Sequence, residues 1–157
     1  MSQKALFAAG CFWGIEDAFK KMPGVLETTV GYSGGHTESP SYDDVCSDTT
    51  GHAETVEVVF DPEKVSFEDL VRKFFDIHNP TTINRQGPDV GSQYRSAIFY
   101  LDEEQKAVAE QVKKELDEAG EYDDPIVTEV TAASTFWPAE EYHQDYYEKN
   151  PGRAGTC

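Results

Sequence analysis

The sequence predicts a single domain in which helices pack on one β-sheet, of the α/β or α+β class. Two observations lead to this prediction. Short apolar or alternating stretches typical of strands alternate with segments of helical periodicity over most of the 157 residues. The length suits one hydrophobic core, and no repeat, low-complexity tract or linker divides the chain. The order of the strands cannot be derived from this pattern.

The first elements follow from apolar spacing and glycine turns. Residues 4–9 form an apolar stretch that predicts a strand ending at Gly10. A helix is expected next, because apolar side chains then recur at helical spacing. These are Cys11, Ile15, Ala18 and Met22. Pro23 and Gly24 stop this helix, and residues 25–32 predict a second strand.

The middle of the chain predicts a strand, a capped helix and a long loop. Residues 54–60 alternate as a strand does, and Ser66 with Asp69 resembles a capping box at the start of a helix. The apolar face of that helix comprises Phe67, Leu70, Val71, Phe74 and Ile77. Residues 78–96 are rich in Pro, Gly, Asn and Gln, and a loop of this length is usually functional or disordered.

The last third predicts two strands and two helices. Residues 97–101 form a strand, and Asp102 caps an acidic helix that ends at Gly120. Residues 126–131 form the last clear strand. Pro138 is expected to start a final helix, which Asn150 and Pro151 terminate.

Composition excludes several classes of function. The net charge is −17, so phosphates would be repelled, and we expect neither nucleic-acid binding nor binding to anionic membranes. No signal peptide or membrane span is expected, because no apolar window is long enough. Three widely spaced cysteines favour a reduced, cytoplasmic thiol protein over a secreted disulfide framework. The cysteines and histidines lack zinc-ligand spacing, so no metal is expected.

The stretch Gly10-Cys11-Phe12-Trp13-Gly14 is the first candidate site. A thiol at a helix N-terminus has its pKa lowered by the unpaired N–H groups and the helix dipole, and the thiolate is the nucleophile. A buried thiol filling a gap is an equally good interpretation of position alone. The adjacent Phe12 and Trp13 favour the functional one, because consecutive helical side chains diverge and at least one should face outward. An exposed aromatic wall suits a small apolar group such as an S-methyl.

Glu54 is the second candidate, because it is in phase with the apolar face of its strand. If the carboxyl group is buried, desolvation raises its pKa and keeps it protonated at neutral pH. A neutral carboxylic acid can donate a proton to a developing oxyanion. The alternative is a strand that starts later and leaves Glu54 solvated at its edge.

Further polar candidates are the phenols Tyr42 and Tyr94, which can donate hydrogen bonds without adding charge, and Asp89 in the long loop. All three could equally be surface residues. Cys46 is expected to be a buried, inert thiol. Cys157 ends a glycine-containing tail, so it could reach a second thiol and form a disulfide, or do nothing.

Taken together, these residues resemble the A-type peptide methionine sulfoxide reductases over nearly the whole chain. The matching segments are 10–14, 31–35, Tyr42 with 45–46, 51–54, 78–81, 86–87 with Asp89, and 91–96. The resemblance implies an α+β domain, with a mixed β-sheet, packed helices and a ferredoxin-like core. It implies one catalytic domain over residues 1–157, with a mobile tail at about 150–157.

The resemblance also implies the activity: reduction of methionine S-sulfoxide, free or in proteins, through a cysteine sulfenic acid and then an intramolecular disulfide. It makes Cys11 the nucleophile, Glu54 the acid and Cys157 the resolving cysteine. The remaining roles are Phe12 and Trp13 around the S-methyl group, Tyr42 and Tyr94 on the sulfoxide oxygen, and Asp89 on the polar side. Thioredoxin would be the partner and reductant, replaced by dithiothreitol in vitro, with no cofactor, and the protein is expected to be a monomer.

One departure and two rival functions remain at this point. The tail reads Gly-Arg-Ala-Gly-Thr-Cys, whereas family members often carry Gly-Tyr-Cys after the Asn-Pro turn. A thiol peroxidase or disulfide oxidoreductase would share a reactive Cys11 but would need neither the methyl pocket nor a protonated Glu54. A peptide-binding module would use Trp13, Tyr42 and Tyr94 as an aromatic groove.

Overall fold

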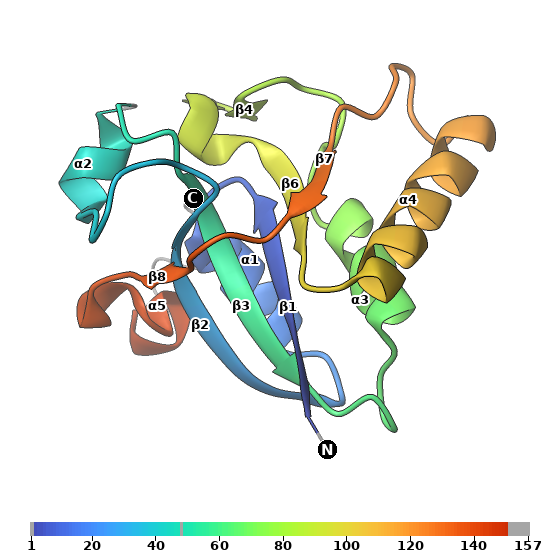
Figure 1. Ribbon diagram of the computed structural model, residues 1–157, viewed down its shortest axis with the longest axis horizontal. Helices are drawn as coiled ribbons and strands as arrows, with labels where there is room; N and C mark the ends of the chain where they lie inside the picture. The colour runs from blue at the N-terminus through green and yellow to red at the C-terminus, as the bar shows by residue number, and fades with distance from the viewer. Residues whose placement is uncertain (1, 48, 151–157) are drawn as a thin grey trace.

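A computed structural model describes residues 2–47 and 49–150 of the chain. Six strands form one mixed sheet in the order β7-β6-β1-β3-β2-β8 (Figure 1). They are β1 (Gln3–Ala9), β2 (Val25–Ser33), β3 (Ala53–Phe60), β6 (Ser96–Tyr100), β7 (Glu129–Ala132) and β8 (Trp137–Pro138). All neighbouring pairs are antiparallel except β6 and β7, which are parallel. The mixed sheet with packed helices confirms the α+β prediction.

The helices divide into longer ones that cover the sheet and shorter ones near its ends. The longer helices are α1 (Phe12–Lys20), α3 (Phe67–Asp76) and α4 (Glu103–Glu118). The shorter ones are α2 (Tyr42–Cys46), α5 (Tyr146–Lys149) and the 3-10 turns η1 (Ser92–Tyr94) and η2 (Glu141–His143). The predicted capping box of α3 is present, since Ser66 and Asp69 exchange side-chain and backbone hydrogen bonds.

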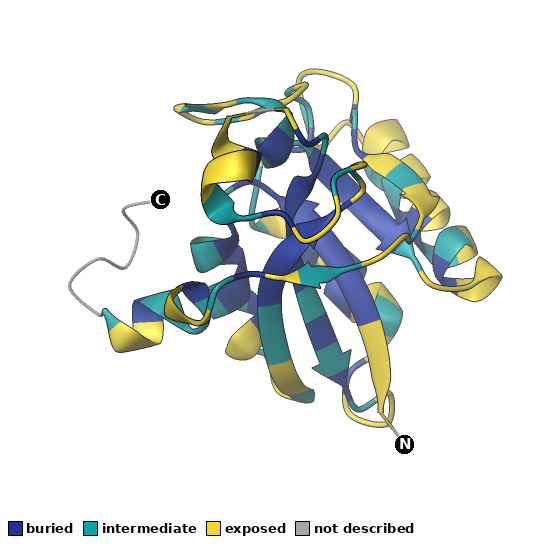
Figure 2. Cartoon of the chain, turned by 60° about the vertical axis from the view of Figure 1, so that its left-hand side comes forward, coloured by how far each residue is buried: buried dark blue, intermediate teal, exposed yellow. Residues whose placement is uncertain are grey.

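The centre of the sheet is buried on both faces, as the dark blue strands of Figure 2 show. On the helical face, Phe7 of β1 stacks against Phe19 of α1 and Phe74 of α3, with ring centroids 4.9 and 5.4 Å apart. These rings join strand and helices into the main hydrophobic cluster. On the other face, Leu6 and Phe99 belong to a smaller cluster.

The chain between β7 and β8 covers that smaller cluster as it crosses the sheet (Figure 1). Phe136 packs against the cluster, and β8 then pairs with β2 at the sheet edge. Gly31 of β2 makes this approach possible, because a Cβ there would lie 2.3 Å from the carbonyl oxygen of Trp137. The C-terminal part of the chain is thereby brought beside β2 and α1.

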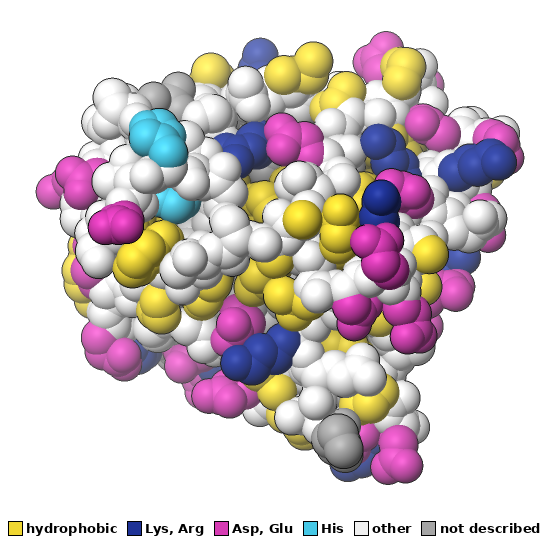
Figure 3. Space-filling view, viewed as in Figure 1, with side chains coloured by type: hydrophobic (Ala, Val, Ile, Leu, Met, Phe, Trp, Pro, Cys, Tyr) yellow, Lys and Arg dark blue, Asp and Glu magenta, His cyan; other side chains and the backbone are white. Residues whose placement is uncertain are grey.

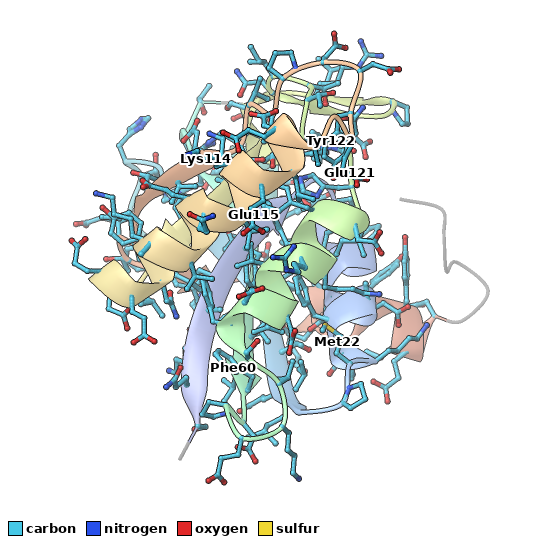
Figure 4. All side chains as sticks on the ribbon, turned by 90° about the vertical axis from the view of Figure 1, so that its right-hand side faces the viewer. Met22, Phe60, Lys114, Glu115, Glu121 and Tyr122 are labelled. Carbon is cyan, nitrogen blue, oxygen red and sulfur yellow. The ribbon has the colours of Figure 1, made fainter. Side chains whose placement is uncertain are left out.

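Carboxylates are spread over the surface in greater number than basic side chains (Figure 3). Helices α3 and α4 lie side by side, with Glu115 of α4 between them (Figure 4). Arg72 of α3 donates to Glu115 at 2.7 Å, an exposed ion pair of the kind that contributes little to stability. Within the residues that the structure describes, no helix is long and apolar enough to cross a membrane.

The structure corrects several expected elements. The helix expected from Pro138 is wrong: Pro138 ends the short strand β8, and between residues 139 and 150 only the turn η2 and the four-residue α5 follow. The strand expected at 126–131 is β7, displaced to 129–132. The long loop 78–96 contains a small hairpin, β4 (Arg85–Gln86) with β5 (Asp89–Val90), and the turn η1. Helix α1 buries Phe12, Ile15, Glu16 and Phe19, so Ile15 is the one predicted position that lies on its buried face, and the helix ends at Lys20, before Met22.

Candidate active site

Cys11 occupies the N-cap position of α1, directly after β1. The strand reaches it through Gly10, whose φ of +101° is a conformation that other residues rarely adopt. A Cβ on Gly10 would also lie 2.8 Å from the side chain of Gln86. The glycine therefore admits a close neighbour from the long loop of the same chain. The expected strand, tight turn and helix start at Cys11 are confirmed.

Glu54 points into the protein beneath the start of α1. It lies on β3 opposite Tyr32 of β2, and its side chain is buried. Oε1 accepts a hydrogen bond of 3.1 Å from the backbone N–H of Phe12. The carboxyl group therefore satisfies one of the N–H groups that the first turn of a helix leaves unpaired. The alternative of a solvated Glu54 at the strand edge is excluded.

The environment of Glu54 favours its neutral form. Burial raises its pKa to about 8, and the nearby negative charge of Asp89 adds to the rise. The hydrogen bond from Phe12 acts in the opposite direction and is the weaker effect. Oε2 is buried and has no hydrogen-bond partner among the described residues. A protonated Glu54 thus has Oε1 occupied as an acceptor, while Oε2 remains to carry the proton.

Three of the predicted polar residues lie near enough to Glu54 to interact with its charge. Tyr94 in η1 interacts with the charges of Glu54 and Asp89, and burial followed by these charges raises its pKa to about 12. Burial likewise raises the pKa of Tyr42, helped by its hydrogen bond with Cys46 and the charge of Glu54. Both phenols therefore remain neutral donors at physiological pH. The structure places Tyr42, Tyr94 and Asp89 within electrostatic range of Glu54.

The two aromatic residues after Cys11 differ in exposure. Phe12 is fully buried and packs against Tyr32 and Tyr42, whereas Trp13 is only half-buried. The indole Nε1–H of Trp13 donates a 3.0 Å hydrogen bond to Nδ1 of His143. Tyr146 stacks on the indole, with centroids 3.8 Å apart and planes 9° apart. The indole of Trp13 is thus held at its N–H edge by His143 and on one face by Tyr146.

His143 was not identified from the sequence, although it lies at the centre of the aromatic residues. Its ring is buried, with centroids 4.3 Å from Tyr42 and 5.4 Å from Phe12. Desolvation lowers its pKa, which suits a neutral ring that accepts from Trp13 through Nδ1. Periodicity gave no signal for His143, because it lies in a short 3-10 turn rather than on a regular helix.

The segment around His143 is tied to the sheet by several hydrogen bonds. Glu140 accepts from the hydroxyl of Tyr32 at 3.0 Å and from the backbone N–H of Tyr42 at 3.1 Å. Gln144 bonds both the N–H and the carbonyl of Val30 on β2. These contacts hold the C-terminal segment, which we define as residues 139–149, beside the aromatic residues.

A hollow of about 360 Å³ opens beside Cys11. One side is formed by α1, through Gly14, Ile15 and Ala18, and the other by residues 86–89 of the long loop, with Ala9, Ile77 and His78 completing the lining. His78 is held between the carbonyl of Phe74 and the hydroxyl of Ser96, and burial lowers its pKa to about 4. The expectation that the long loop contributes to a site agrees with this arrangement.

The other two cysteines have different outcomes. The expectation that Cys46 is buried is wrong, because it is exposed at the end of α2, where the helix turns only its Val45 side toward the core. Its thiol hydrogen-bonds with Tyr42. Cys157 lies outside the described residues. Among residues 2–47 and 49–150, no group of three or more His, Cys, Asp or Glu side chains could hold a metal ion.

The pKa of Glu54 gives a testable pH dependence of stability. Below about pH 4.5 the carboxyl group is neutral in both states, whereas up to about pH 8 only the unfolded state ionises. Wild type should therefore lose stability relative to Glu54→Gln as pH rises through this window, by at most about 1.4 kcal/mol per pH unit. Urea denaturation at several pH values measures this difference.

Glu57→Gln, on the same strand but partly exposed, is the matched control, and its free energy of unfolding should change with pH as that of wild type does. If the difference in free energy of unfolding between wild type and Glu54→Gln did not change with pH, the raised pKa of Glu54 would be contradicted.

Known proteins that are similar to this chain belong to one family, the peptide methionine sulfoxide reductases. A family model described as peptide methionine sulfoxide reductase matches residues 3–157. A protein from Methanothermobacter thermautotrophicus, named peptide methionine sulfoxide reductase MsrA, is 59% identical over 96% of this chain and 89% of its own length. A protein of the same name from Natronomonas pharaonis is 55% identical over 96% of this chain and 85% of its own.

Solved structures share the fold. Reduced Mxr1 from Saccharomyces cerevisiae has a TM-score of 0.90 at 36% identity and covers 96% of this chain and 86% of its own. Methionine sulfoxide reductase A of Corynebacterium diphtheriae has a TM-score of 0.84 at 38% identity, with 96% and 76% covered. Mxr1 in complex with Trx2 has the same fold, with a TM-score of 0.65 at 23% identity, and 92% and 84% covered. The chain therefore belongs to the peptide methionine sulfoxide reductase family and is an oxidoreductase that reduces methionine sulfoxide.

Proposed function

We propose that this enzyme reduces the S epimer of methionine sulfoxide, free or in proteins, with Cys11 as nucleophile and Glu54 as proton donor. The observation that supports this most strongly is the buried Glu54 carboxyl group, which accepts from the N–H of the residue that follows Cys11. A sulfoxide oxygen leaves poorly as an anion, so the reaction needs an acid that is still protonated at neutral pH. A thiol peroxidase or a peptide-binding module would have no need of such an acid, and family membership disfavours both.

In the first step, the Cys11 thiolate attacks the sulfur of the sulfoxide while Glu54 protonates its oxygen. The attack forms a bond between the two sulfur atoms. This bond and the sulfur–oxygen bond of the substrate then break as the hydroxyl group moves to the Cys11 sulfur, which leaves a sulfenic acid on Cys11. Methionine is released, so the substrate sulfur gains the two electrons that the Cys11 sulfur loses. The N-terminal turn of α1 stabilises the thiolate, because its N–H groups and dipole face the cysteine.

The phenols and Asp89 complete the polar side of the site. Tyr42 and Tyr94 donate hydrogen bonds to the sulfoxide oxygen and to the charge that develops on it. Their position is supported by their electrostatic interaction with Glu54. Asp89 lies on the same side, where its charge helps to keep Glu54 protonated. The two phenols are therefore donors toward the sulfoxide oxygen at the moment when that oxygen accepts a proton from Glu54.

Phe12 and Trp13 hold the S-methyl group of the substrate. The half-buried indole supplies the wall of this methyl pocket, while Phe12, being fully buried, serves as its base. The rings fix the methyl group of the sulfoxide sulfur, and Glu54 fixes its oxygen. The remaining carbon substituent of that sulfur can then point in only one direction. Selection of a single epimer follows, because exchange of oxygen and lone pair would move the oxygen away from the donors.

Regeneration is proposed to use Cys157 and thioredoxin. The Cys157 thiol attacks the sulfenic acid, which forms a Cys11–Cys157 disulfide and releases water, and thioredoxin then reduces the disulfide by thiol exchange. The yeast relative Mxr1, whose reduced form is 36% identical to this chain, has been crystallised with Trx2. Dithiothreitol would replace thioredoxin in vitro, and no cofactor enters any step. A reduced cytoplasm is the compartment that suits this cycle, and a monomer suffices for it.

We extend the proposal to the architecture of the core, which we assign as ferredoxin-like. The order β6-β1-β3-β2, with α1 joining β1 to β2 and α3 between β3 and β6, supports this assignment. Cys11 and Glu54 then belong to neighbouring elements of this core, on α1 and β3.

The proposed reaction predicts an epimer-specific activity. With dithiothreitol as reductant, wild type should form methionine from the S epimer alone, and Cys11→Ser should form none. Glu54→Gln should keep KM near the wild-type value and lose kcat by roughly 10²- to 10⁴-fold, the range expected for loss of a general acid. Methionine formation from the separated epimers measures all three. Turnover of the R epimer, or unchanged kcat in Glu54→Gln, would contradict the proposed geometry.

Removal of the terminal thiol predicts a stalled cycle. Cys157→Ala should release one methionine per protein and then stop with thioredoxin as the only reductant, because Cys11 remains a sulfenic acid that no second thiol resolves. Rapid-quench measurement of methionine, with dimedone labelling of the sulfenic acid, tests this. The exposed Cys46 provides the matched control, since Cys46→Ala should continue to cycle. Sustained turnover of Cys157→Ala would show that another thiol resolves Cys11.

A further inference from the structure

Glu16 of α1 is a buried carboxyl group that no step of the proposed reaction uses. It is 1% exposed and lies on the face of the helix that also buries Phe12, Ile15 and Phe19. Burying a carboxyl group is costly unless its oxygens are hydrogen-bonded. Both oxygens of Glu16 have such partners, and neither partner belongs to α1.

The two oxygens of Glu16 reach different parts of the chain. Oε2 accepts a 3.0 Å hydrogen bond from the hydroxyl of Thr28 on β2. Oε1 accepts a 2.8 Å hydrogen bond from the backbone N–H of Asp145, 129 residues further along the sequence. The carboxyl group therefore links α1 to the sheet and, separately, to the C-terminal segment.

Asp145 occupies a turn that needs external support. Its φ of +53° and ψ of +39° lie in the left-handed region, where residues other than glycine are uncommon. This turn directs the chain into α5, whose first residue is Tyr146. The side chain of Asp145 also pairs with Lys20 at the surface, but a partly exposed ion pair holds a backbone only weakly. The hydrogen bond that the Asp145 N–H donates to the buried Glu16 carboxyl group is the stronger restraint on the turn.

Tyr146 is the residue that stacks on Trp13, so the position of the turn determines where the stacking ring lies. We propose that Glu16 is a positioning residue for the methyl pocket: by holding the N–H of Asp145, it fixes Tyr146 against Trp13. The proposal deepens the proposed function and rests on it for the role of Trp13 in substrate binding. Glu16 itself touches neither Cys11 nor Glu54 through any contact that the structure describes.

The chemistry of the carboxyl group determines which variants test this. Either protonation state retains an acceptor oxygen for Asp145, and so does the amide of glutamine. Glu16→Gln should therefore preserve the position of Tyr146. Glu16→Met has a similar volume but no acceptor for the Asp145 N–H, and Glu16→Ala can replace it if the methionine variant does not fold.

The first readout is independent of catalysis. The chain has two tryptophans, so Trp137→Phe leaves Trp13 as its single indole. In that background, Glu16→Met should raise the acrylamide quenching constant of Trp13 fluorescence by about twofold or more, because Tyr146 no longer shields one face. Glu16→Gln should match the background. Thr28→Val is the matched control, since it removes the other partner of the same carboxyl group and leaves the Asp145 bond, so quenching should be unchanged.

The second readout uses activity with dithiothreitol. Glu16→Met should raise KM for the sulfoxide roughly three- to tenfold with a smaller effect on kcat, and Tyr146→Ala should do the same. In the double variant the two effects should not multiply, because both act through the same ring. Multiplicative effects would overturn the proposal. So would equal quenching changes in Thr28→Val and Glu16→Met, which would indicate general loosening.

Failure of the proposed function would look different. If Trp13 does not bind substrate, Trp13→Phe leaves KM unchanged, while quenching still responds to Glu16→Met in the Trp137→Phe background. If Glu16 does not position Tyr146, Trp13→Phe raises KM but quenching remains at the background value in Glu16→Met.

Discussion

The hydrogen bond between the backbone N–H of Phe12 and Oε1 of Glu54 is the interaction on which the site depends. It joins the first turn of α1 to the start of β3, at a position closed to water. The bond attaches Glu54 to the residue that follows the N-cap Cys11. Any arrangement that separated α1 from β3 would separate the proposed nucleophile from the proposed acid, so the packing of this helix on the sheet is a requirement of the proposed chemistry as well as of stability.

The same position sets two opposing effects on Glu54. A helix N-terminus favours an anion, and the N–H bond from Phe12 lowers the pKa of the carboxyl group. Burial outweighs this bond and raises the pKa to about 8. Glu16 of α1 shows the same opposition between burial and hydrogen bonding. Two hydrogen bonds lower the pKa of its carboxyl group, yet burial still raises that pKa to about 7. The loss of hydration is thus the dominant effect at both carboxyl groups.

The positions of the proposed nucleophile and acid could be predicted from the sequence, because they depend on local pattern. The strand-to-helix turn places Cys11, and the alternation of 54–60 places Glu54 on the buried face. The supporting residues could not be predicted, since His143 and Tyr146 lie in elements too short for periodicity and reach Trp13 only through tertiary packing. Two features of the sequence do indicate residues that the pattern analysis above leaves out or misplaces, Glu16 and Cys46. Glu16 occupies an apolar position of α1, and the five-residue α2 has only one buried face, which leaves Cys46 outside.

The most direct test of the account is the ionisation of Glu54 itself. Infrared difference spectroscopy of wild type against Glu54→Gln isolates the carbonyl band of one neutral carboxyl group, and a pH titration follows its loss. The band should persist at pH 7 and disappear with a midpoint of about 8, because burial keeps Glu54 protonated at neutral pH. A band that is already lost by pH 6 would show an ionised Glu54, which could not protonate a sulfoxide oxygen, and would contradict the proposed chemistry.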